Sequence, residues 1–354
     1  YSRMKMKINN EPKLDFDDVL IVPQRSSVSS RRDVNLKRKF KFYHSQKEWH
    51  GTPIMAANMI ATGTFSMSAE LMKYGMVTCL HKHYDSDKLA AYYEYYDAFA
   101  YTWVTLGMSS NGDQFQNIDT VAQKHGFYPN ICIDVANGYT EYFVDYCKAI
   151  RQSVGGSPII MAGNVCTPDM VTELILHGGV DIVKVGIGPG SACTTRLKTG
   201  VGYPQLSAIA ECAHAAHGLR RDAGRLGLIC ADGGCRTPGD VAKAYGAGAD
   251  FVMLGGMLAG TDECEGEVND GVFTFYGMSS EMAQDKHGNG LQEYRASEGR
   301  VIEMASKGPV QDVVRDIHGG VRSACTYTGV DNLKDFSKAC QFVKVNRTHF
   351  DQSV

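Results

Sequence analysis

The sequence predicts one (β/α)8 barrel, and two regularities along the chain lead to this fold class. Apolar, β-branched runs occur eight times from residue 53 onward, at near-regular spacing with one longer gap. Amphipathic stretches fill the intervals between them. Strands that are apolar on both faces and alternate with helices form a parallel sheet covered by helices. Eight such units predict a closed barrel, whereas the alternative, a doubly wound sheet, usually has fewer units.

The expected strands and helices alternate in order, and flanking segments extend them at both ends. The strands are Pro53–Ala57, Met76–Leu80, Thr102–Leu106, Asn130–Val135, Pro158–Ala162, Asp181–Val185, Gly227–Ala231 and Asp250–Leu254. The helices are Thr64–Tyr74, Ser86–Phe99, Asp113–His125, Thr140–Ser153, Pro168–His177, Gln205–His217, Pro238–Tyr245 and Val310–Tyr327. Residues 1–50 are expected to form an arm and a hairpin, in which Val34 to Phe42 alternates like a solvated strand. The barrel takes residues 51–330 with a long excursion at 257–308, and residues 331–354 form a tail.

Composition narrows the class of protein. With 44% hydrophobic and 21% charged residues, the chain can bury a large core. The net charge of -3 provides no basic face, which argues against a nucleic-acid partner. The chain has no run of 18 apolar residues and no apolar secretory signal, so no membrane association is expected. The 11 cysteines are odd in number and form no C-x-x-C pair, which indicates reduced thiols in a cytoplasmic protein.

Polar and glycine residues follow most of the expected strands. These strand ends are Asn58-Met59, His81-Lys82-His83, Asp134-Val135-Ala136, Gly163-Asn164, Asp232-Gly233-Gly234 and Gly255-Gly256. The carboxyl ends of barrel strands meet on one face, where (β/α)8 enzymes place their active sites. Glycine pairs after strands 7 and 8 occupy the usual position of a phosphate site in this fold. The sequence therefore predicts a phosphate-binding site on this face.

The longest glycine-rich stretch runs from Lys184 to Gln205, after strand 6, and it contains a single thiol, Cys193. Backbone N–H groups in such a loop form an anion-binding nest. A cysteine presented there can act as a nucleophile. Taken alone, the loop also suits a tight strand-to-helix connection that holds a buried cysteine. The prediction of a nucleophile therefore depends on the rest of the chain.

Several motifs occur in a specific order along the chain. They are Gly190–Arg196 (GSACTTR), Asp232–Gly234, Gly255–Gly256, Gly277–Ser279 and Arg295–Gly299. This set resembles the IMP dehydrogenase/GMP reductase family, and the resemblance runs from Leu14 to Val345. Between His83 and Trp103 there is no room for the CBS modules that IMP dehydrogenases usually carry. Only eleven residues separate Met282 from Tyr294, too few for the long mobile flap of the dehydrogenases.

The layout therefore resembles the GMP reductase branch of this family. The resemblance implies the reaction GMP + NADPH + H⁺ → IMP + NH₃ + NADP⁺ in purine nucleotide interconversion. Two alternatives stay open: an IMP dehydrogenase without CBS modules, and a non-catalytic barrel that binds purine nucleotides.

The resemblance also implies the catalytic roles. Cys193 would attack the purine C2 and form a covalent thioimidate, which divides one difficult step into two. Thr195, relayed with Glu298, would protonate the departing amine, because a threonine hydroxyl alone is too weak an acid.

Further ligand contacts are implied by the same resemblance. The substrate-binding residues would be Ser191, Asp232, Gly233, Gly234, Gly255, Gly256, Gly277, Met278, Ser279, Arg295, Ala296, Ser297 and Gly299. The NADPH-binding residues would be Ser26, Ser27, Lys82, Asp134, Val135, Ala136, Ile187, Gly188, Met278, Tyr294, Arg295, Ser323, Ala324, Cys325 and Thr326. No G-x-G-x-x-G follows a first strand, so NADPH would bind without a Rossmann domain. Part of the NADPH set reaches across a subunit boundary in this family, which implies a homotetramer.

A monovalent cation, K⁺, is the last expected ligand. Its site resembles the family's, with the backbone carbonyls of Gly188, Gly190 and Cys193 and with Arg196 nearby. Oxygen ligands of this kind suit hard cations.

One position departs from the family pattern. Members usually read Asn-Met-Asp-Thr at the end of strand 1, whereas this chain has Asn58-Met59-Ile60-Ala61. A carboxylate is thereby replaced by an apolar side chain on the expected active face. This change puts in question the positioning of the cofactor or the order of that loop.

Overall fold

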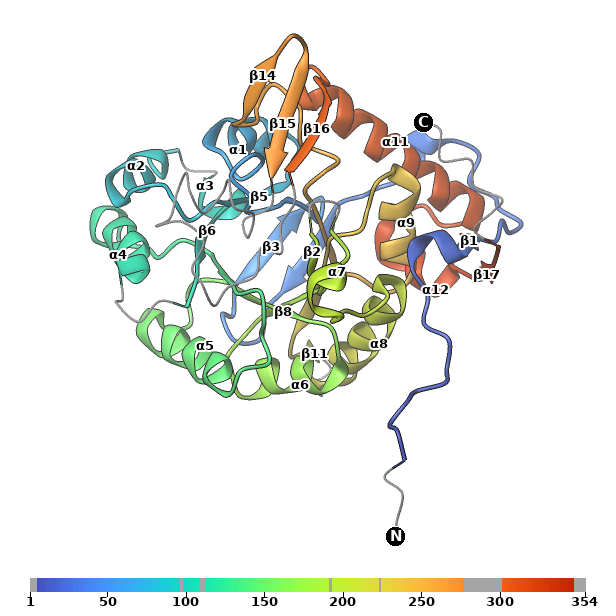
Figure 1. Cartoon of the computed structure of the whole chain (residues 1–354), viewed down its shortest axis with the longest axis horizontal. Helices are drawn as coiled ribbons and strands as arrows, with labels where there is room; N and C mark the ends of the chain where they lie inside the picture. Colours follow the sequence, from blue (N-terminus) through green and yellow to red (C-terminus); the bar gives the residue numbers. More distant parts are fainter. Residues whose placement is uncertain are drawn as a thin grey trace.

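A computed structural model describes residues 5–95, 98–108, 113–190, 193–222, 224–276 and 301–346. Within this part of the chain, eight parallel strands form a closed barrel (Figure 1). The strands are β4 (Ile54–Ala56), β5 (Val77–Leu80), β6 (Thr102–Leu106), β7 (Ile131–Asp134), β8 (Ile160–Val165), β9 (Ile182–Val185), β12 (Leu228–Asp232) and β13 (Phe251–Leu254). The last strand, β13, pairs with the first, β4, so the sheet has no open edge. The predicted fold class is confirmed, and the doubly wound alternative is excluded.

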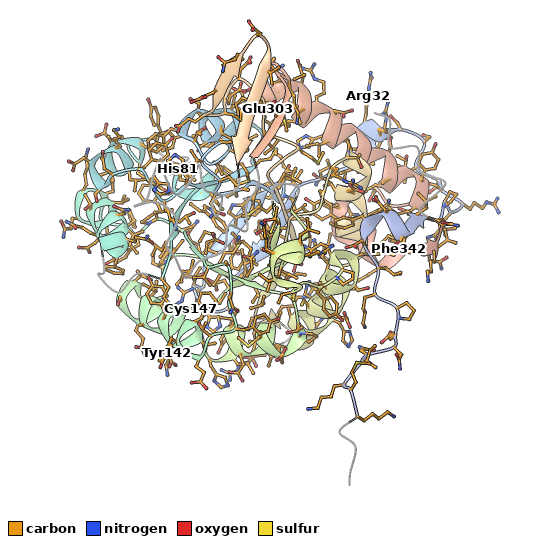
Figure 2. All side chains as sticks on the ribbon, in the orientation of Figure 1. Arg32, His81, Tyr142, Cys147, Glu303 and Phe342 are labelled. Carbon is orange, nitrogen blue, oxygen red and sulfur yellow. The ribbon has the colours of Figure 1, made fainter. Side chains whose placement is uncertain are left out.

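Helices surround the barrel as an outer ring (Figure 1). They are α1 (Phe65–Leu71), α2 (Ser86–Tyr92), α3 (Ala98–Tyr101), α4 (Asp113–His125), α5 (Glu141–Val154), α6 (Pro168–Leu176), α8 (Gln205–Gly218), α9 (Pro238–Gly246) and α11 (Val310–Thr328). Each covers the barrel with its apolar face. In α5, Cys147 is buried while Tyr142 is 74% exposed on the outer surface (Figure 2).

Side chains alternate between the inside of the barrel and its outer surface, as successive residues of a strand must. In β9, Ile182 belongs to the apolar cluster inside the barrel, and Val183 belongs to the cluster between barrel and helices. Inside the barrel, the residues near the N-terminal ends of the strands are apolar. The interior positions toward the C-terminal ends of β7, β9 and β12 carry the charged residues Asp134, Lys184 and Asp232.

The N-terminal hairpin closes the opposite end of the barrel. Strands β2 (Arg38–Lys41) and β3 (Glu48–Gly51) pair in register, with Phe40 opposite Trp49. Both rings are at most 5% exposed and pack against Phe251 at the start of β13, and the buried ring of Phe42 lies beside Phe40. The prediction of a solvated strand is therefore wrong for one face. Lys37, Lys39 and Lys41 do face solvent, but the apolar residues of the strand close the barrel.

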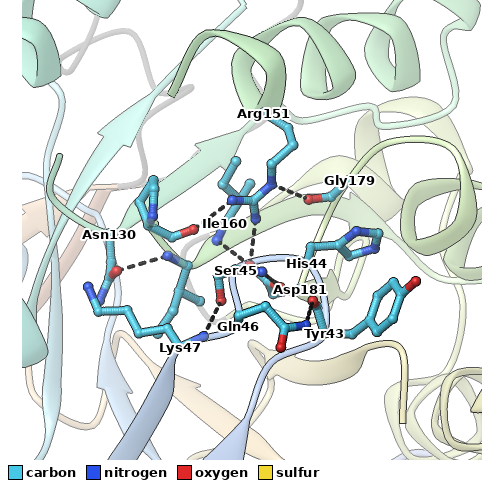
Figure 3. Close-up of polar contacts among 12 residues, drawn as sticks. Tyr43, His44, Ser45, Gln46, Lys47, Asn130, Arg151, Ile160, Gly179 and Asp181 are labelled. Atoms are coloured by element: carbon cyan, nitrogen blue, oxygen red, sulfur yellow. Dashed lines mark hydrogen bonds and ion pairs between the residues drawn. The ribbon is translucent and has the colours of Figure 1, made fainter. Parts of the chain in front are cut away.

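A buried ion pair attaches the turn of this hairpin to the barrel (Figure 3). The carboxylate of Asp181, directly before β9, accepts hydrogen bonds from Nη2 of Arg151 at 2.6 Å and from the backbone N–H of Ile160 at 2.9 Å. It also accepts one from the backbone N–H of Ser45 in the turn, at 3.3 Å. Burial raises the pKa of Asp181, with Arg151 opposing this shift, and burial lowers the pKa of Arg151. The cost of burying each charge is therefore offset by its ionic partner together with these hydrogen bonds.

Two further segments extend the barrel. After β13, strands β14 (Glu267–Asn269), β15 (Val272–Tyr276) and β16 (Val301–Ala305) form a small antiparallel sheet that projects above α1 (Figure 1). In the C-terminal segment, β17 (Phe342–Lys344) pairs with β1 (Val19–Ile21), so a segment that precedes the barrel and one that follows it are joined. Within the described residues, no helix has both the length and the apolar character needed to cross a bilayer.

The Arg151–Asp181 pair leads to a stability prediction. Arg151→Met leaves the Asp181 carboxylate buried without its cation, so the free energy of unfolding should fall by about 3–5 kcal/mol in urea denaturation. The control is Arg315→Met, which removes an exposed pair with Asp312 at 3.9 Å. That change should cost at most about 1 kcal/mol. Equal losses in the two variants would contradict the assigned role of Arg151.

A second prediction concerns acid stability. His318 on α11 is inserted among packed side chains, where burial, assisted by Arg322, lowers its pKa to about 4. In the unfolded chain His318 has its ordinary pKa of 6.5, so it binds a proton more tightly there than in the folded protein. The free energy of unfolding therefore falls as the pH drops from 6.5 toward 4. Between pH 7 and pH 5 this group should account for about 2 kcal/mol of lost stability. In urea denaturation of His318→Phe, the loss of unfolding free energy between pH 7 and pH 5 should be smaller by this amount. A loss as large as that of the unmodified protein would refute the prediction.

Candidate active site

Three glycine-rich segments follow three neighbouring strands. Strands β9 and β12 pair in parallel, with Val185 opposite Ala231, and β12 pairs in parallel with β13, with Asp232 opposite Met253. The segments after these strands therefore begin side by side at the C-terminal ends of the strands, which we call the barrel mouth. They are the Cys193 loop, Gly233-Gly234 and Gly255-Gly256. The predicted phosphate segments thus lie next to the predicted nucleophile loop.

Direct contacts hold these segments together. A Cβ added to Gly233 would meet Cγ of Pro189 at 3.2 Å, so the turn after β12 packs against the Cys193 loop. The side-chain amide of Gln205 donates to the backbone carbonyl of Val185 at 2.9 Å and to that of Asp232 at 3.3 Å. Gln205 is the first residue of α8 and is 1% exposed. It therefore fixes the exit of β9 relative to the exit of β12.

Within the loop, a thiol and a hydroxyl lie close together. Sγ of Cys193 is 3.0 Å from Oγ1 of Thr195, which begins the short helix α7 (Thr195–Thr199). The backbone N–H of Cys193 donates to the carbonyl oxygen of Gly190 at 3.1 Å. Cys193 is half-buried and Thr195 is 9% exposed. The pair is positioned for a proton to pass between sulfur, hydroxyl and a bound ligand.

A buried charge cluster lies in the barrel interior at the mouth. Nζ of Lys184 is 2.8 Å from Oδ1 of Asp134 and 2.6 Å from Oδ2 of Asp232, and the Lys184 side chain is 3% exposed. Asn58 donates to Oδ2 of Asp134 at 3.0 Å, and Asn164 donates to Oδ2 of Asp232 at 2.8 Å. All five side chains come from different strands or strand ends.

The charges in this cluster support one another. Burial alone would lower the pKa of Lys184, but the carboxylates of Asp134 and Asp232 outweigh burial and raise it well above its ordinary value. Burial likewise opposes the charge on Asp134, but Lys184 and the hydrogen bond from Asn58 outweigh it, so the pKa of Asp134 is lowered. Lys184 and Asp134 are therefore both charged at neutral pH.

The loop after β4 contains the unusual Ile60. Its side chain is 6% exposed. The surrounding loop is held by hydrogen bonds from Gly63 N–H to the carbonyl of Met59 at 2.8 Å and from Glu265 N–H to the carbonyl of Ala61 at 2.9 Å. Neither bond uses the side chain of residue 60. The order of this loop therefore does not depend on a carboxylate there.

The expected cofactor residues fall into two groups. Lys82, with an exposed side chain, follows β5. Asp134 ends β7, and Val135 and Ala136 follow it, so all four lie at the barrel mouth. Ser323, Ala324, Cys325 and Thr326 lie on α11 in the outer ring (Figure 1). Ser26 packs beside the end of that helix, where a Cβ on Gly329 would meet Cα of Ser26 at 3.7 Å. Ser27 follows Ser26 in the chain. Because this second group lies on and beside an outer helix, it is separate from the mouth of the same barrel.

Some expected site residues lie outside the described part of the chain. They are Ser191, Gly277, Met278, Ser279, Tyr294, Arg295, Ala296, Ser297, Glu298 and Gly299.

Sequence reasoning assigned no role to Lys184, Asn58 or Asn164. The signal for Lys184 was a charged residue inside an otherwise apolar strand, two positions after the interior residue Ile182. Such a residue must point into the barrel, where it needs a partner.

The residues at the mouth have chemistry that suits the expected dinucleotide and monovalent cation. The ammonium of Lys82 and the carboxylate of Asp134 suit the phosphates and the polar donors of a dinucleotide. The backbone carbonyls of Gly188 and Gly190 are of the type that a hard monovalent cation takes. Gly188 approaches Arg196 so closely that a Cβ would lie 2.8 Å from its Cγ. No group of three or more His, Cys, Asp or Glu side chains in the described chain is placed to hold a metal.

A barrel whose mouth combines a thiol–hydroxyl pair, glycine turns and buried charges is typical of enzymes that bind phosphorylated ligands. Comparison with known proteins agrees. Residues 13–353 match the model of the IMP dehydrogenase / GMP reductase domain. Over 344 residues, the chain is 50% identical to the GMP reductases of Aeromonas hydrophila and Serratia proteamaculans and 49% identical to that of Escherichia coli O81; each match covers 96% of this chain and 97% of the relative. The chain belongs to the IMP dehydrogenase/GMP reductase family, as the motifs predicted.

The close approach of β9 and β12 at the mouth leads to a third prediction. Gly186 has a φ of 148°, and a Cβ there would lie 2.2 Å from the backbone oxygen of Asp232. Gly200 also has a positive φ, 72°, but nothing lies within 4 Å of its Cβ position. Gly200→Ala should therefore cost only the backbone strain, about 1–2 kcal/mol of unfolding free energy. Gly186→Ala should cost about 1–3 kcal/mol more because the two strand exits must separate. Urea midpoints of the two variants test this order, and equal midpoints would contradict it.

Proposed function

We propose that this protein catalyses the NADPH-dependent reductive deamination of GMP to IMP and ammonia. The observation that carries the proposal is the Cys193–Thr195 pair, with 3.0 Å between sulfur and hydroxyl oxygen, on a loop packed against a glycine turn at the barrel mouth. The relatives named GMP reductase, about half identical over nearly the whole chain, support the same activity.

Cys193 is the nucleophile in this proposal. Its sulfur adds to the purine C2 of GMP, and the electron pair of the attacked C=N bond moves onto the ring nitrogen. The C2–N bond of the exocyclic amine then breaks, and ammonia leaves after taking up a proton. The product of this half-reaction is a thioimidate between Cys193 and the purine, which is more readily reduced than the starting guanine.

The leaving amine needs a proton at the moment of departure. Thr195 lies within hydrogen-bonding distance of the Cys193 sulfur and is therefore close to C2 when the thioimidate forms. In the proposal its hydroxyl delivers the proton and is replenished from Glu298. A carboxyl partner is required because the hydroxyl alone is too weak an acid.

The remaining residues bind and orient the nucleotide. Asp232 holds the ribose hydroxyls, and backbone N–H groups near Ser191, Gly234 and Gly256 hold the 5′-phosphate. The purine is framed by Met278, Ser279, Arg295 and Gly299, with Gly233, Gly255, Gly277, Ala296 and Ser297 completing the substrate site. Asp232 suits its role because no hydrogen bond from a described residue reaches its Oδ1, while Lys184 and Asn164 hold Oδ2.

NADPH, when bound, supplies the hydride that reduces C2 and releases the cysteine thiol. Lys82, Asp134, Val135, Ala136, Ile187, Gly188 and Tyr294 hold its nicotinamide half, together with Met278 and Arg295. The adenosine half is held by Ser26, Ser27 and Ser323–Thr326. These residues lie apart from the mouth of their own barrel, which supports a homotetramer in which neighbouring subunits share the cofactor. A potassium ion bound by the carbonyls of Gly188, Gly190 and Cys193 near Arg196 would order the catalytic loop.

The eleven free cysteines support a cytoplasmic location, since thiols stay reduced there.

The fourth prediction tests the activity itself. Mixing the protein with GMP and NADPH should lower the absorbance at 340 nm and release one ammonia for each NADPH oxidised. Cys193→Ala should lose turnover by on the order of 10³-fold or more while it still binds GMP, because covalent catalysis is removed and the binding contacts remain. Cys340→Ala, at a half-buried thiol in the C-terminal segment, is the matched control and should keep full turnover.

Three other outcomes would replace the proposal. Reduction of NAD⁺ with IMP, without NADPH oxidation by GMP, would indicate an IMP dehydrogenase. Tight GMP binding without turnover would indicate a purine-nucleotide sensor. Full turnover in Cys193→Ala would eliminate the covalent route.

A further inference from the structure

One buried cation touches both halves of the candidate site. The ammonium of Lys184 lies 2.8 Å from Asp134 and 2.6 Å from Asp232. Under the proposed function, Asp134 belongs to the nicotinamide side and Asp232 to the ribose side. The two carboxylates therefore share one counterion.

The barrel is built to allow this bridge. Asp134 of β7 and Lys184 of β9 are separated by β8, and the residue between them in register is Gly163. A Cβ on Gly163 would lie 2.7 Å from Cβ of Lys184 and 2.3 Å from its backbone oxygen. The glycine therefore leaves the space through which Lys184 reaches Asp134.

Within the hydrogen-bonded cluster one ammonium contacts two carboxylates, while Lys82 adds an electrostatic attraction to Asp134 from outside the cluster. The Asp134 and Asp232 side chains are 29% and 19% exposed, while Lys184 is 3% exposed. Both carboxylates can therefore meet ligands from the mouth, whereas the cation between them cannot. A change at either carboxylate can reach the other through Lys184, which contacts both.

We propose that Lys184 is a positioning residue that couples nucleotide binding to dinucleotide binding. Ribose hydroxyls that donate to Asp232 reduce its attraction for the shared ammonium. Lys184 then holds Asp134 more firmly in its present orientation, in which the second carboxylate oxygen accepts a hydrogen bond from Asn58. A carboxylate that is already ordered costs less entropy when the nicotinamide half arrives. Each ligand therefore binds the protein more tightly when the other ligand is already bound, and the factor is the same in both directions.

The fifth prediction measures this coupling directly, and it rests on the proposed function. IMP and NADPH form a redox-inert pair, because C2 of IMP is already reduced and NADPH can accept no hydride. Isothermal titration gives the Kd of IMP with and without saturating NADPH. In the unmodified protein the Kd should fall by about 5-fold or more when NADPH is present. In Lys184→Met the ratio of the two Kd values should be close to one.

A matched control separates coupling from the general loss of a buried cation. Arg151→Met removes a cation paired with Asp181, directly before the same strand β9 but at the opposite end of the barrel. It should lower stability and leave the Kd ratio unchanged. Addition of n-propylammonium to Lys184→Ala should restore the ratio, whereas n-butanol, of similar size and uncharged, should not.

A variant of nearly equal shape covers the case in which Lys184→Met does not fold. Asp134→Asn keeps the size of the side chain and removes only its charge, so the ratio should again approach one. A ratio near one in the unmodified protein, or an undiminished ratio in a folded Lys184→Met or Asp134→Asn protein, would overturn the coupling and leave the proposed reaction standing. Failure of the unmodified protein to bind IMP at all would overturn the proposed function, and the coupling with it.

Discussion

The interior of a closed eight-stranded barrel is only wide enough to be filled by side chains, and alternate residues of every strand must point into it. In β9 and β12 the first inward residues, Ile182 and Leu228, are apolar. The inward residues nearer the mouth are Lys184 and Asp232. A single charge in that space would cost several kcal/mol, so charges are stable there only as an adjacent, hydrogen-bonded group. The polar chemistry of the mouth therefore depends on how the strands close beneath it.

The two buried charges of β9 and its approach have different roles. Asp181, directly before β9, pairs with Arg151 and holds the hairpin turn, so its partners are structural. Lys184, inside the same strand, pairs with two carboxylates that are open to the mouth. Both arrangements are buried ion pairs, but only the second leaves carboxylate surface exposed. Partial exposure of the anions distinguishes a cluster that can respond to a ligand from one that only ties elements together.

The sequence predicted the barrel because its strands are apolar on both faces, a pattern that few other folds share. The Cys193 loop and the glycine turns could also be predicted, since each follows a strand directly and strand ends converge. The aromatic closure by Phe40 and Trp49 could not, because alternation in β2 shows an apolar face without showing what it packs against. The pairing of Lys184 with Asp134 depends on strand register and on the empty space at Gly163, which no local pattern contains. The roles of Glu298 and Arg295 rest on their motifs.

The aromatic hairpin has a consequence for where this domain begins. Phe40 and Trp49 pack against Phe251 at the N-terminal end of the barrel, with Phe42 beside Phe40, although all three precede the first barrel strand in the sequence. A fragment cut to the repeating β/α units alone, starting near residue 53, would leave Phe251 and its apolar neighbours facing water. Such a fragment would be prone to self-association rather than to independent folding. The minimal folding unit therefore includes the hairpin, and shortening from the N-terminus must also spare β1, which pairs with β17.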